Sequence, residues 1–542
     1  MTSFRNKLSA ALFLSLFIYP ALAEDKIPPV PSVRLYSLKK MDTNGYGTIV
    51  PSDQDVLNQG IWKNSSYPVI AAKMAQIPQT LPAAAEELRL KILKLATDPP
   101  AGTTGQDFIT LRLKRLFERG QFDDVLSLLK KIPEKQRTDE QNKIHLDVLL
   151  IRDFKNSCAL SEKESDMPER LYHAAVCAAE AQDSDKAFLA LDLLKEQGKS
   201  DEFTSNAVDY FLYAKPLNTP PENVTPLSAS VWRETEHSLT DLQTSQSPLW
   251  FNALLAEDKS VAGEIRLPLA EQLTQKGLMP ASKLKDLYEH IPLPDKKNKT
   301  LSGAFQRAAL IRRAMTETDN LSLQEMMKEG FQSAKKEGVP YAFTLTVKDI
   351  LEKLTPDADT LAESLELIEM FSLAELPDKV SEWQSKAELA FPVSETSAYG
   401  WYFANLFQQD ENQRFFTPAL KNMTAYEEQK QIKNRNTSAK QDRLMLVFKI
   451  LDLLSPEEEP AFATFSPDAA ENAFIGEKAS VSSSLKEKTG ERLIEVLKKI
   501  DGSYIGLLNA LSGLNELGLS EEAKKLAAQS MDLILGSEKQ DE

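Results

Sequence analysis

The amino-acid sequence predicts an all-α fold in which irregular helical hairpins stack on one another as an α-solenoid. Two observations carry this prediction. Only 20 of the 542 residues are glycine, whereas the strong helix formers leucine, alanine, glutamate and lysine are abundant. From Pro82 onward, apolar residues also recur with a period of about 3.6, which is the spacing of one buried face on a helix.

The first clear hairpin consists of two apolar stripes that are separated by Gly120 and Gln121. The stripes are Ile109, Leu113, Leu116 and Phe117, and then Phe122, Val125, Leu126, Leu129 and Ile132. Because so short a break reverses the chain, the two helices are expected to be antiparallel neighbours. Similar units at 171–198 and 504–534 predict a TPR-like superhelix, with Ser520 as the N-cap of the last helix. The repeat length is irregular, and a compact helical bundle is the alternative.

Proline, glycine and serine mark the expected boundaries between the parts of the chain. Residues 24–80 are expected to be irregular, because the run from Pro28 to Pro31 cannot lie inside a helix. The predicted parts that follow are the helical-repeat array at 81–455 with a possible break at 214–226, a linker at 456–485, and a C-terminal helical hairpin cap at 486–542.

The first 23 residues have the pattern of a secretory signal peptide. Arg5 and Lys7 precede an uncharged apolar run at 8–19, and Ala21-Leu22-Ala23 is a small-x-small cleavage site. An apolar first helix of the folded domain is the alternative. Cleavage after Ala23 predicts a periplasmic or secreted protein without a transmembrane segment, because the apolar run is shorter than the about 20 residues that span a bilayer.

Charge and cysteine content narrow the function classes further. The chain has 64 basic and 80 acidic residues, a net charge of −16, which disfavours binding to nucleic acid and anionic lipid. Its two cysteines, Cys158 and Cys177, are expected to form a structural disulfide in an oxidising compartment. Two free thiols and a redox role are the alternatives.

The segment from Asp42 to Asp53 resembles the start of an EF-hand calcium loop. Asp42, Asn44 and Gly47 occupy loop positions one, three and six. However, Tyr46 takes a ligand position and Asp53 replaces the bidentate glutamate at position twelve. A turn-rich loop is therefore the expectation, a weak cation site remains the alternative, and no cofactor is predicted.

No catalytic constellation stands out in the sequence, and the chain is expected not to be an enzyme. The four histidines, His145, His173, His237 and His290, lack partners at metal-finger or H-E-x-x-H spacing and are interpreted as ordinary helix residues. The run from Gly277 to Pro280 resembles a fragment of lytic transglycosylases, whose Glu-Ser pair would have to be Glu363-Ser364. That pair lies on the wrong side of the fragment in the sequence.

The densest aromatic cluster is the candidate partner-binding site. Its members are Tyr399, Trp401, Tyr402, Phe403, Phe407, Phe415 and Phe416. The residues expected to contact a partner are Trp401, Tyr402, Phe403 and Phe407. Aromatic faces can anchor a partner peptide or stack on sugars. Packing between helices is the competing interpretation of the same cluster.

Several strings together resemble a family of alphaproteobacterial exported proteins that are often named "antifreeze glycopeptide polyprotein". The strings run from Gly60 to Lys63, Pro99 to Gly102, Asn156 to Leu160, Ala187 to Gly198 and Trp250 to Glu257. The resemblance implies export and helical packing, and it transfers no functional residues. The chain also lacks the Ala-Ala-Thr repeats that the family name suggests.

Together these features predict a non-catalytic exported scaffold that binds an envelope protein or a cell-wall component along its helical array. A peptidoglycan-active enzyme, or its accessory domain, is the alternative. The identity of the partner, the oligomeric state and the biological process have no signature in the sequence.

Overall fold

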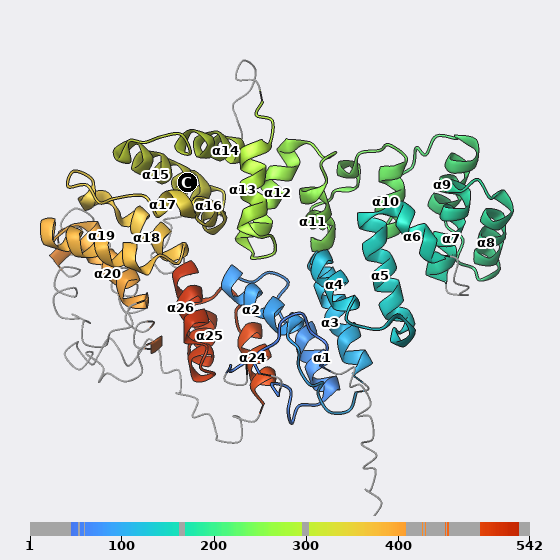
Figure 1. Ribbon diagram of the computed structural model, residues 1–542, viewed down its shortest axis with the longest axis horizontal. Helices are drawn as coiled ribbons and strands as arrows, with labels where there is room; N and C mark the ends of the chain where they lie inside the picture. Colours follow the sequence, from blue (N-terminus) through green and yellow to red (C-terminus); the bar gives the residue numbers. More distant parts are fainter. Residues whose placement is uncertain are drawn as a thin grey trace, which may run out of the picture. The chain divides into compact units, whose positions relative to one another are not determined.

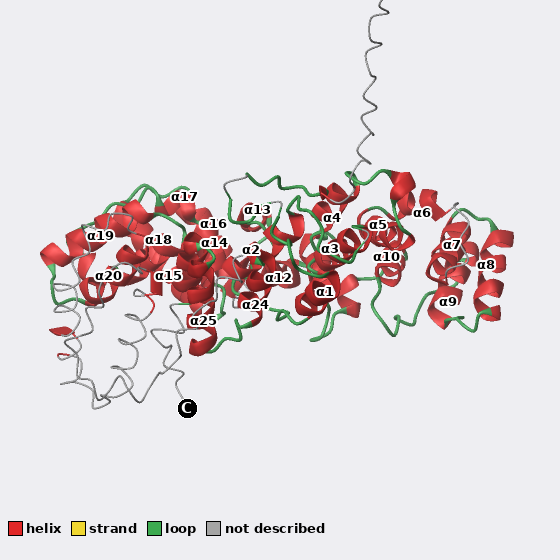
Figure 2. Ribbon diagram, turned by 90° about the horizontal axis from the view of Figure 1, so that it is seen from below, coloured by secondary structure: helices red, strands yellow, loops and turns green. Residues whose placement is uncertain are grey.

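A computed structural model describes residues 45–52, 55–58, 60–103, 105–161, 168–294, 303–407 and 488–530, together with 425–426, 429, 450 and 453–454. The predicted signal peptide, residues 24–44 and the predicted linker at 456–485 lie outside the described residues. Within the described part the fold is all-α, as predicted. Figure 2 shows helices joined by loops, and the only β-type pairing there is two isolated bridges, Ile49 with Leu95 and Ser66 with Ala101.

The described residues contain 23 α-helices and three short 3-10 helices. Up to residue 257 the helices are α1 (Tyr67–Ala75), α2 (Ala83–Lys94), α3 (Gln106–Glu118), α4 (Phe122–Leu129), η2 (Glu134–Gln136), α5 (Asp139–Arg152), α6 (Phe154–Ser161), α7 (Pro168–Glu180), α8 (Ser184–Glu196), α9 (Glu202–Tyr213), α10 (Pro226–Glu234), η3 (Leu239–Leu242) and α11 (Leu249–Glu257). Then follow α12 (Gly263–Gln275), α13 (Ala281–His290), α14 (Gly303–Ala314), α15 (Asn320–Lys336), α16 (Pro340–Thr346), α17 (Lys348–Leu351), η4 (Leu361–Glu363), α18 (Leu365–Leu373), α19 (Pro377–Ala390), α20 (Glu395–Phe407), α24 (Thr489–Lys498), α25 (Tyr504–Glu516) and α26 (Ser520–Gln529). Among these helices, none combines the length and the apolar character that a membrane crossing requires.

Helices that follow one another in the sequence pack as pairs (Figure 1). Examples are α3 with α4, α7 with α8, α11 with α12, α14 with α15 and α25 with α26. In the first pair, Ile109, Leu113 and Leu116 are fully buried, as the apolar stripe predicts. Gly120 makes the turn between α3 and α4 with φ +72°, a conformation that residues with a Cβ rarely adopt.

The residues that cap the helix starts agree with the sequence prediction only in part. Thr138 and Gln141 form a reciprocal capping box at the start of α5. The prediction that Ser520 caps the last helix is wrong. Leu519 is the N-cap of α26, and Ser520 is the first helical residue. Its hydroxyl instead donates to Asn515 Oδ1 at 2.6 Å, which ties the start of α26 to the end of α25.

The described part of the segment that was expected to be irregular contains one α-helix, α1, near its end. Pro68 lies in the first turn of α1, where its missing N–H costs nothing and its fixed φ favours helix. The backbone before α1 is held by Arg112, which is fully buried on α3. Its guanidinium donates to the carbonyls of Leu93 and Leu95 at 2.7 Å each and of Tyr46 at 2.8 Å.

The C-terminal helices pack against the first helices of the described part. In Figure 1 the red helices α24 to α26 lie beside the blue α1 and α2. Gly490 N donates to Ile61 O at 2.8 Å, and Lys73 pairs with Glu491 at 2.8 Å. Helix α26 contacts α2, α18 and α20. The contacts of Gly490 and Glu491 therefore join parts of the chain that are more than 400 residues apart in the sequence.

Candidate functional site

The predicted aromatic cluster lies mainly in the core. Trp401 is 4% exposed, and Tyr402 and Phe403 are completely buried on α20. The side chain of Phe407 lies outside the described residues. A buried ring cannot serve as a surface anchor, so the competing interpretation, packing between helices, is the one that the structure supports for these three residues.

A cavity in the described part lies where the turns of two hairpins meet the ends of α2, α5 and α11. Its volume is about 470 Å³, within the range of small-ligand sites. The turn between α3 and α4 and the turn between α12 and α13 form one wall each. They are held together by Gln121, whose side-chain amide donates to Leu278 O at 2.8 Å.

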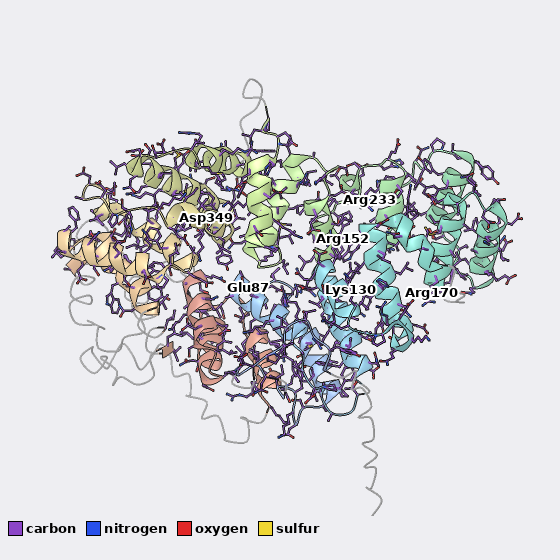
Figure 3. The ribbon with its side chains drawn as sticks, in the orientation of Figure 1. Glu87, Lys130, Arg152, Arg170, Arg233 and Asp349 are labelled. Carbon is purple, nitrogen blue, oxygen red and sulfur yellow. A yellow bond between two sulfur atoms is a disulfide. The ribbon has the colours of Figure 1, made fainter. Side chains whose placement is uncertain are left out.

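Four of the charged side chains that line this cavity form one network. Arg152 donates to Glu257 at 2.6 Å and to Asp123 at 3.2 Å. Lys283 donates to Glu257 at 2.6 Å and lies 3.7 Å from Asp123. The Arg152 guanidinium also lies 5.2 Å from the centre of the Phe122 ring. Figure 3 shows Arg152 between α4 and α11.

A second cavity of about 440 Å³ shares this network with the first. Asp123, Arg152, Glu257 and Lys283 line both cavities. We call the two together the charged groove. The charged side chains that line it are the basic Lys91, Lys94, Arg152, Lys259, Arg266 and Lys283 and the acidic Glu87, Asp123, Asp124, Glu257 and Asp286. The groove is thus nearly balanced in charge, although the chain as a whole carries −16.

Several donors in the charged groove have no partner in the described part of the chain. Thr274 is 1% exposed and its hydroxyl makes no hydrogen bond, and neither does the buried Nε of Arg266. Helix α13 begins in the groove after Pro280, with no side-chain cap and no acidic residue in its first turn. The N–H groups of Ala281 and Ser282 therefore have no intrahelical partner, and the helix dipole favours a negative group there.

Glu87 lies at the edge of the charged groove on α2, where Figure 3 labels it. Burial raises the pKa of its carboxyl above the usual range, while the charge of Lys525 opposes the shift. Tyr341 of α16 donates its hydroxyl to Glu87 Oε1 at 3.2 Å. The same carboxyl thus connects α2, at the edge of the groove, to α16.

Glu363, the residue that the transglycosylase resemblance would require as an acid, is exposed on η4. It is not among the residues that line the charged groove, whereas Gly277, Leu278, Met279 and Pro280 are. The two parts of that resemblance are therefore not brought together at this site.

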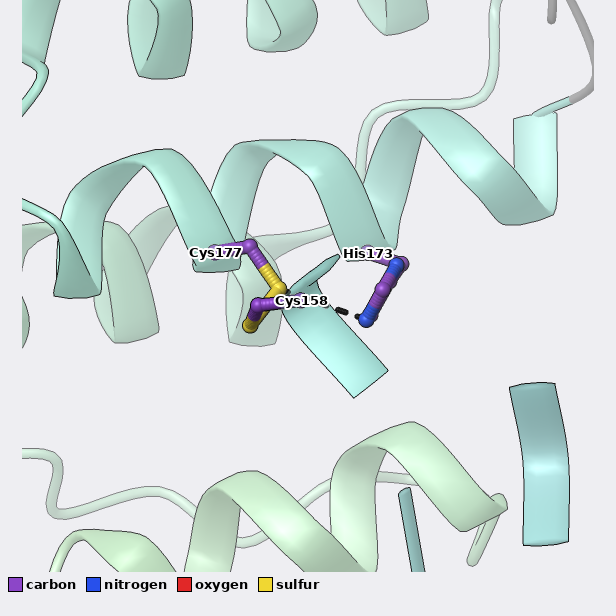
Figure 4. Close-up of side chains that lie close together, drawn as sticks. All are labelled: Cys158, His173 and Cys177. Atoms are coloured by element: carbon purple, nitrogen blue, oxygen red, sulfur yellow. Dashed lines mark hydrogen bonds between the residues drawn. A yellow bond between two sulfur atoms is a disulfide. The ribbon is translucent and has the colours of Figure 1, made fainter. Parts of the chain in front are cut away.

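The structure places Cys158 of α6 and Cys177 of α7 at disulfide distance, with their Cα atoms 5.4 Å apart. His173 lies one helical turn before Cys177 on α7, and its ring points toward the two sulfurs (Figure 4). Its Nε2 is 3.2 Å from Cys177 Sγ and 3.0 Å from Ser157 Oγ. The interpretation of all four histidines as ordinary helix residues overlooked this contact, although the spacing of four between His173 and Cys177 was visible in the sequence.

Compared with models of protein families, with curated proteins and with solved structures, the chain shows no match. The candidate sites therefore rest on the geometry alone.

The charged groove could not be predicted from the sequence because its walls come from seven separate helices, α2, α4, α5, α11, α12, α13 and α16. Arg152, Glu257 and Lys283 are each more than 20 residues from the others, and each is an unremarkable charge at a helix end. The one local signal was the glycine turns, since Gly120 and Gly277 both line the cavity and both have positive φ. A turn that packs against another element has to bring its backbone close, and glycine permits this.

Proposed function

We propose that this protein is a non-catalytic, exported scaffold of stacked helical hairpins, arranged as a TPR-like α-solenoid, that binds an extended peptide segment of an envelope protein in the charged groove. The observation that supports this most directly is the balanced charge of the groove in a strongly acidic chain. A peptide carries carboxylate and ammonium groups together, whereas nucleic acid would meet net repulsion from the rest of the surface. Export and the kinship with the alphaproteobacterial family belong to the same proposal.

The donors without a partner supply the attraction for a carboxylate of the peptide. The first N–H groups of α13, the Thr274 hydroxyl and the Arg266 Nε all lie along the groove. Buried donors without a hydrogen bond are uncommon in folded proteins. Thr274 lines the first cavity and Arg266 the second, so separate carboxylates of a bound peptide would accept from these donors, which favours binding.

The salt bridges that line the groove can be exchanged for bonds to a ligand at little cost. The side chain of Glu257 is 20% exposed, that of Arg152 30%, and that of Lys283 45%. Partly exposed ion pairs stabilise a fold by only about 0.2–1 kcal/mol each. Charged groups of a peptide can therefore replace Asp123 or Glu257 as partners without unfolding the site.

The test is a pull-down from envelope extract with three tagged proteins that lack residues 1–23. They are the unaltered chain, the double variant Arg152→Glu with Lys283→Glu, and the matched control Lys336→Glu, which reverses an exposed charge on α15 outside the groove. We expect one partner to be captured by the first and third proteins, and at least roughly tenfold less by the double variant, because two attractive charges become repulsive.

Salt and structure controls complete this test. Raising the salt concentration should weaken capture, because partly exposed charges are screened. Far-UV circular dichroism must show the same helix content for all three proteins. Capture of the same partner at equal levels by all three would contradict the proposal.

A second candidate function is the peptidoglycan-active one, because Gly277 to Pro280 line the charged groove. It predicts that the purified protein lowers the turbidity of isolated cell-wall sacculi, and that Glu363→Gln abolishes this loss. If the unaltered protein binds to the sacculi without lowering their turbidity, the occupant of the groove is a cell-wall peptide. The scaffold proposal then holds with a different source of ligand.

A further inference from the structure

Cys158, His173 and Cys177 bring three ligand atoms within 4.8 Å of one another. Cys158 lies on α6, and His173 and Cys177 share one face of α7, where residues four apart are neighbours. Two of the three residues are buried, His173 to 1% and Cys177 to 5% exposure. These residues lie outside the charged groove, so the inference below is independent of the proposed function.

His173 is more than a packing residue for the disulfide. Its Nε2 faces Cys177 Sγ and the hydroxyl of Ser157, while its Nδ1 is buried without a hydrogen bond in the described part. Burial lowers the pKa of His173 to about 4, so the ring is neutral near pH 7 and a nitrogen lone pair is available.

We propose that reduction of the Cys158–Cys177 disulfide converts this cluster into a binding site for a soft metal ion such as Zn²⁺. Two cysteine sulfurs with one histidine nitrogen form a known zinc ligand set, with a fourth position open to water or another oxygen. Ser157 Oγ lies 3.0 Å from His173 Nε2 and is an oxygen that can take this position. Oxidation excludes the metal, and reduction admits it.

The chemistry of the switch balances with a dithiol as the reductant. The dithiol gives two electrons and two protons, the S–S bond breaks, two thiols form, and the dithiol becomes a disulfide. Each thiol then loses its proton as it binds the metal, so binding releases protons to the solvent. Because the Cα atoms are 5.4 Å apart, rotation of one cysteine side chain can separate the sulfurs to about 3.8 Å, the spacing that tetrahedral zinc requires.

The experiment titrates Co²⁺, a spectroscopic substitute for Zn²⁺, into the full chain under anaerobic conditions. The protein is compared as oxidised, as reduced with a phosphine, and as the reduced variant His173→Gln. We expect the reduced chain to bind one Co²⁺ with thiolate-to-cobalt charge-transfer absorption that Zn²⁺ displaces. The oxidised chain should lack this absorption, and His173→Gln should weaken binding by about tenfold or more.

The matched control is His237→Gln, because His237 packs against Trp232 and lies away from both cysteines in the sequence. It should bind Co²⁺ as the unaltered chain does. Absence of the absorption from the reduced chain, or equal affinity in His173→Gln, would overturn the proposal. If reduction loosens α6 and α7, the melting temperature of the reduced chain is decisive. A rise with Zn²⁺ that His173→Gln abolishes supports the site, and no rise refutes it.

Discussion

At the scale of single residues, buried polar groups show two different ways of being accommodated. Arg112 is fully buried, yet each of its three guanidinium nitrogens donates to a backbone carbonyl. Burial lowers the pKa of Arg112 to about 10, and the side chain remains charged at neutral pH. His173 is equally buried but keeps one nitrogen without a partner. Such a group makes stability depend on pH.

The first prediction is that stability falls as pH falls because of His173. Its pKa is 6.5 in the unfolded chain and about 4 in the folded one, so between these values the unfolded state binds more protons. Its contribution is thus fully present above pH 6.5 and is lost as the pH falls toward 4. We expect the unaltered protein to lose about 3 kcal/mol more than His173→Gln between pH 7 and 4, measured by urea unfolding.

Other titrating groups affect both proteins equally, so the difference between them isolates His173. His237→Gln, tested in parallel, should follow the unaltered protein. Identical pH curves for the unaltered protein and His173→Gln would show that the imidazole is not desolvated.

At the scale of elements, local chemistry predicted where helices and turns lie better than it predicted what they do in the fold. The stripes around Gly120 became α3 and α4, and the same residues now form a wall of the charged groove. The aromatic residues 401–403 were visible as a cluster, but their burial was not, because it depends on which helices pack against α20. Helix α1 was not predicted because its nine residues are too few to show a clear 3.6-residue period, and prolines and glycines lie nearby in the sequence.

The second prediction concerns the turn between α3 and α4. Gly120→Ala forces a Cβ onto a positive φ and into overlap with the methyl group of Ala253 on α11. We expect it to destabilise the protein by about 1–3 kcal/mol, measured by chemical denaturation, because both strain and overpacking act.

Gly198→Ala provides the matched control for this turn. Gly198 also has positive φ, but a Cβ there meets open space. Only the backbone strain of about 1 kcal/mol applies to it. Equal losses in the two variants would mean that the turn does not pack tightly on α11.

The third prediction concerns the link between α6 and α7. The disulfide spans 19 positions, and closing such a loop stabilises a fold by about 3 kcal/mol through the unfolded state. The double variant Cys158→Ser with Cys177→Ser should lose that amount in urea unfolding, and so should the reduced protein. A thiol assay on the unreduced, denatured protein that finds two free thiols would contradict the disulfide.

At the scale of the whole described chain, the C-terminal helices are bound to the N-terminal ones. Trp62 is 1% exposed, and its ring stacks edge-on against Phe108 at 5.5 Å. Its Nε1 donates to Thr97 Oγ1 at 3.1 Å, and Gly490 of α24 packs against its ring. Helices near both ends of the chain thus share one piece of core and should unfold together.

The fourth prediction tests this coupling. Trp62→Ala should destabilise the protein by about 3–5 kcal/mol and raise amide hydrogen exchange in α1 and α24 together. Trp250→Ala on α11 is the matched control, since it removes a comparable buried ring. It should leave exchange in α24 unchanged. If Trp62→Ala raises exchange in α1 alone, the C-terminal helices are not coupled to the N-terminal ones.

The sequence by itself determined the all-α class, the helical hairpins around Gly120, and the single pairing open to two cysteines. The helices and hairpins depend on residues a few positions apart, so their signals are local. Two cysteines in one chain allow only one intramolecular pairing. Only the tertiary structure decided that α24 and α26 pack on α1 and α2, that Arg152, Glu257 and Lys283 meet in one groove, and that His173 faces the disulfide. Such contacts join residues from separate helices, whose meeting is set by the packing of many apolar faces at once and leaves no periodic trace in the sequence.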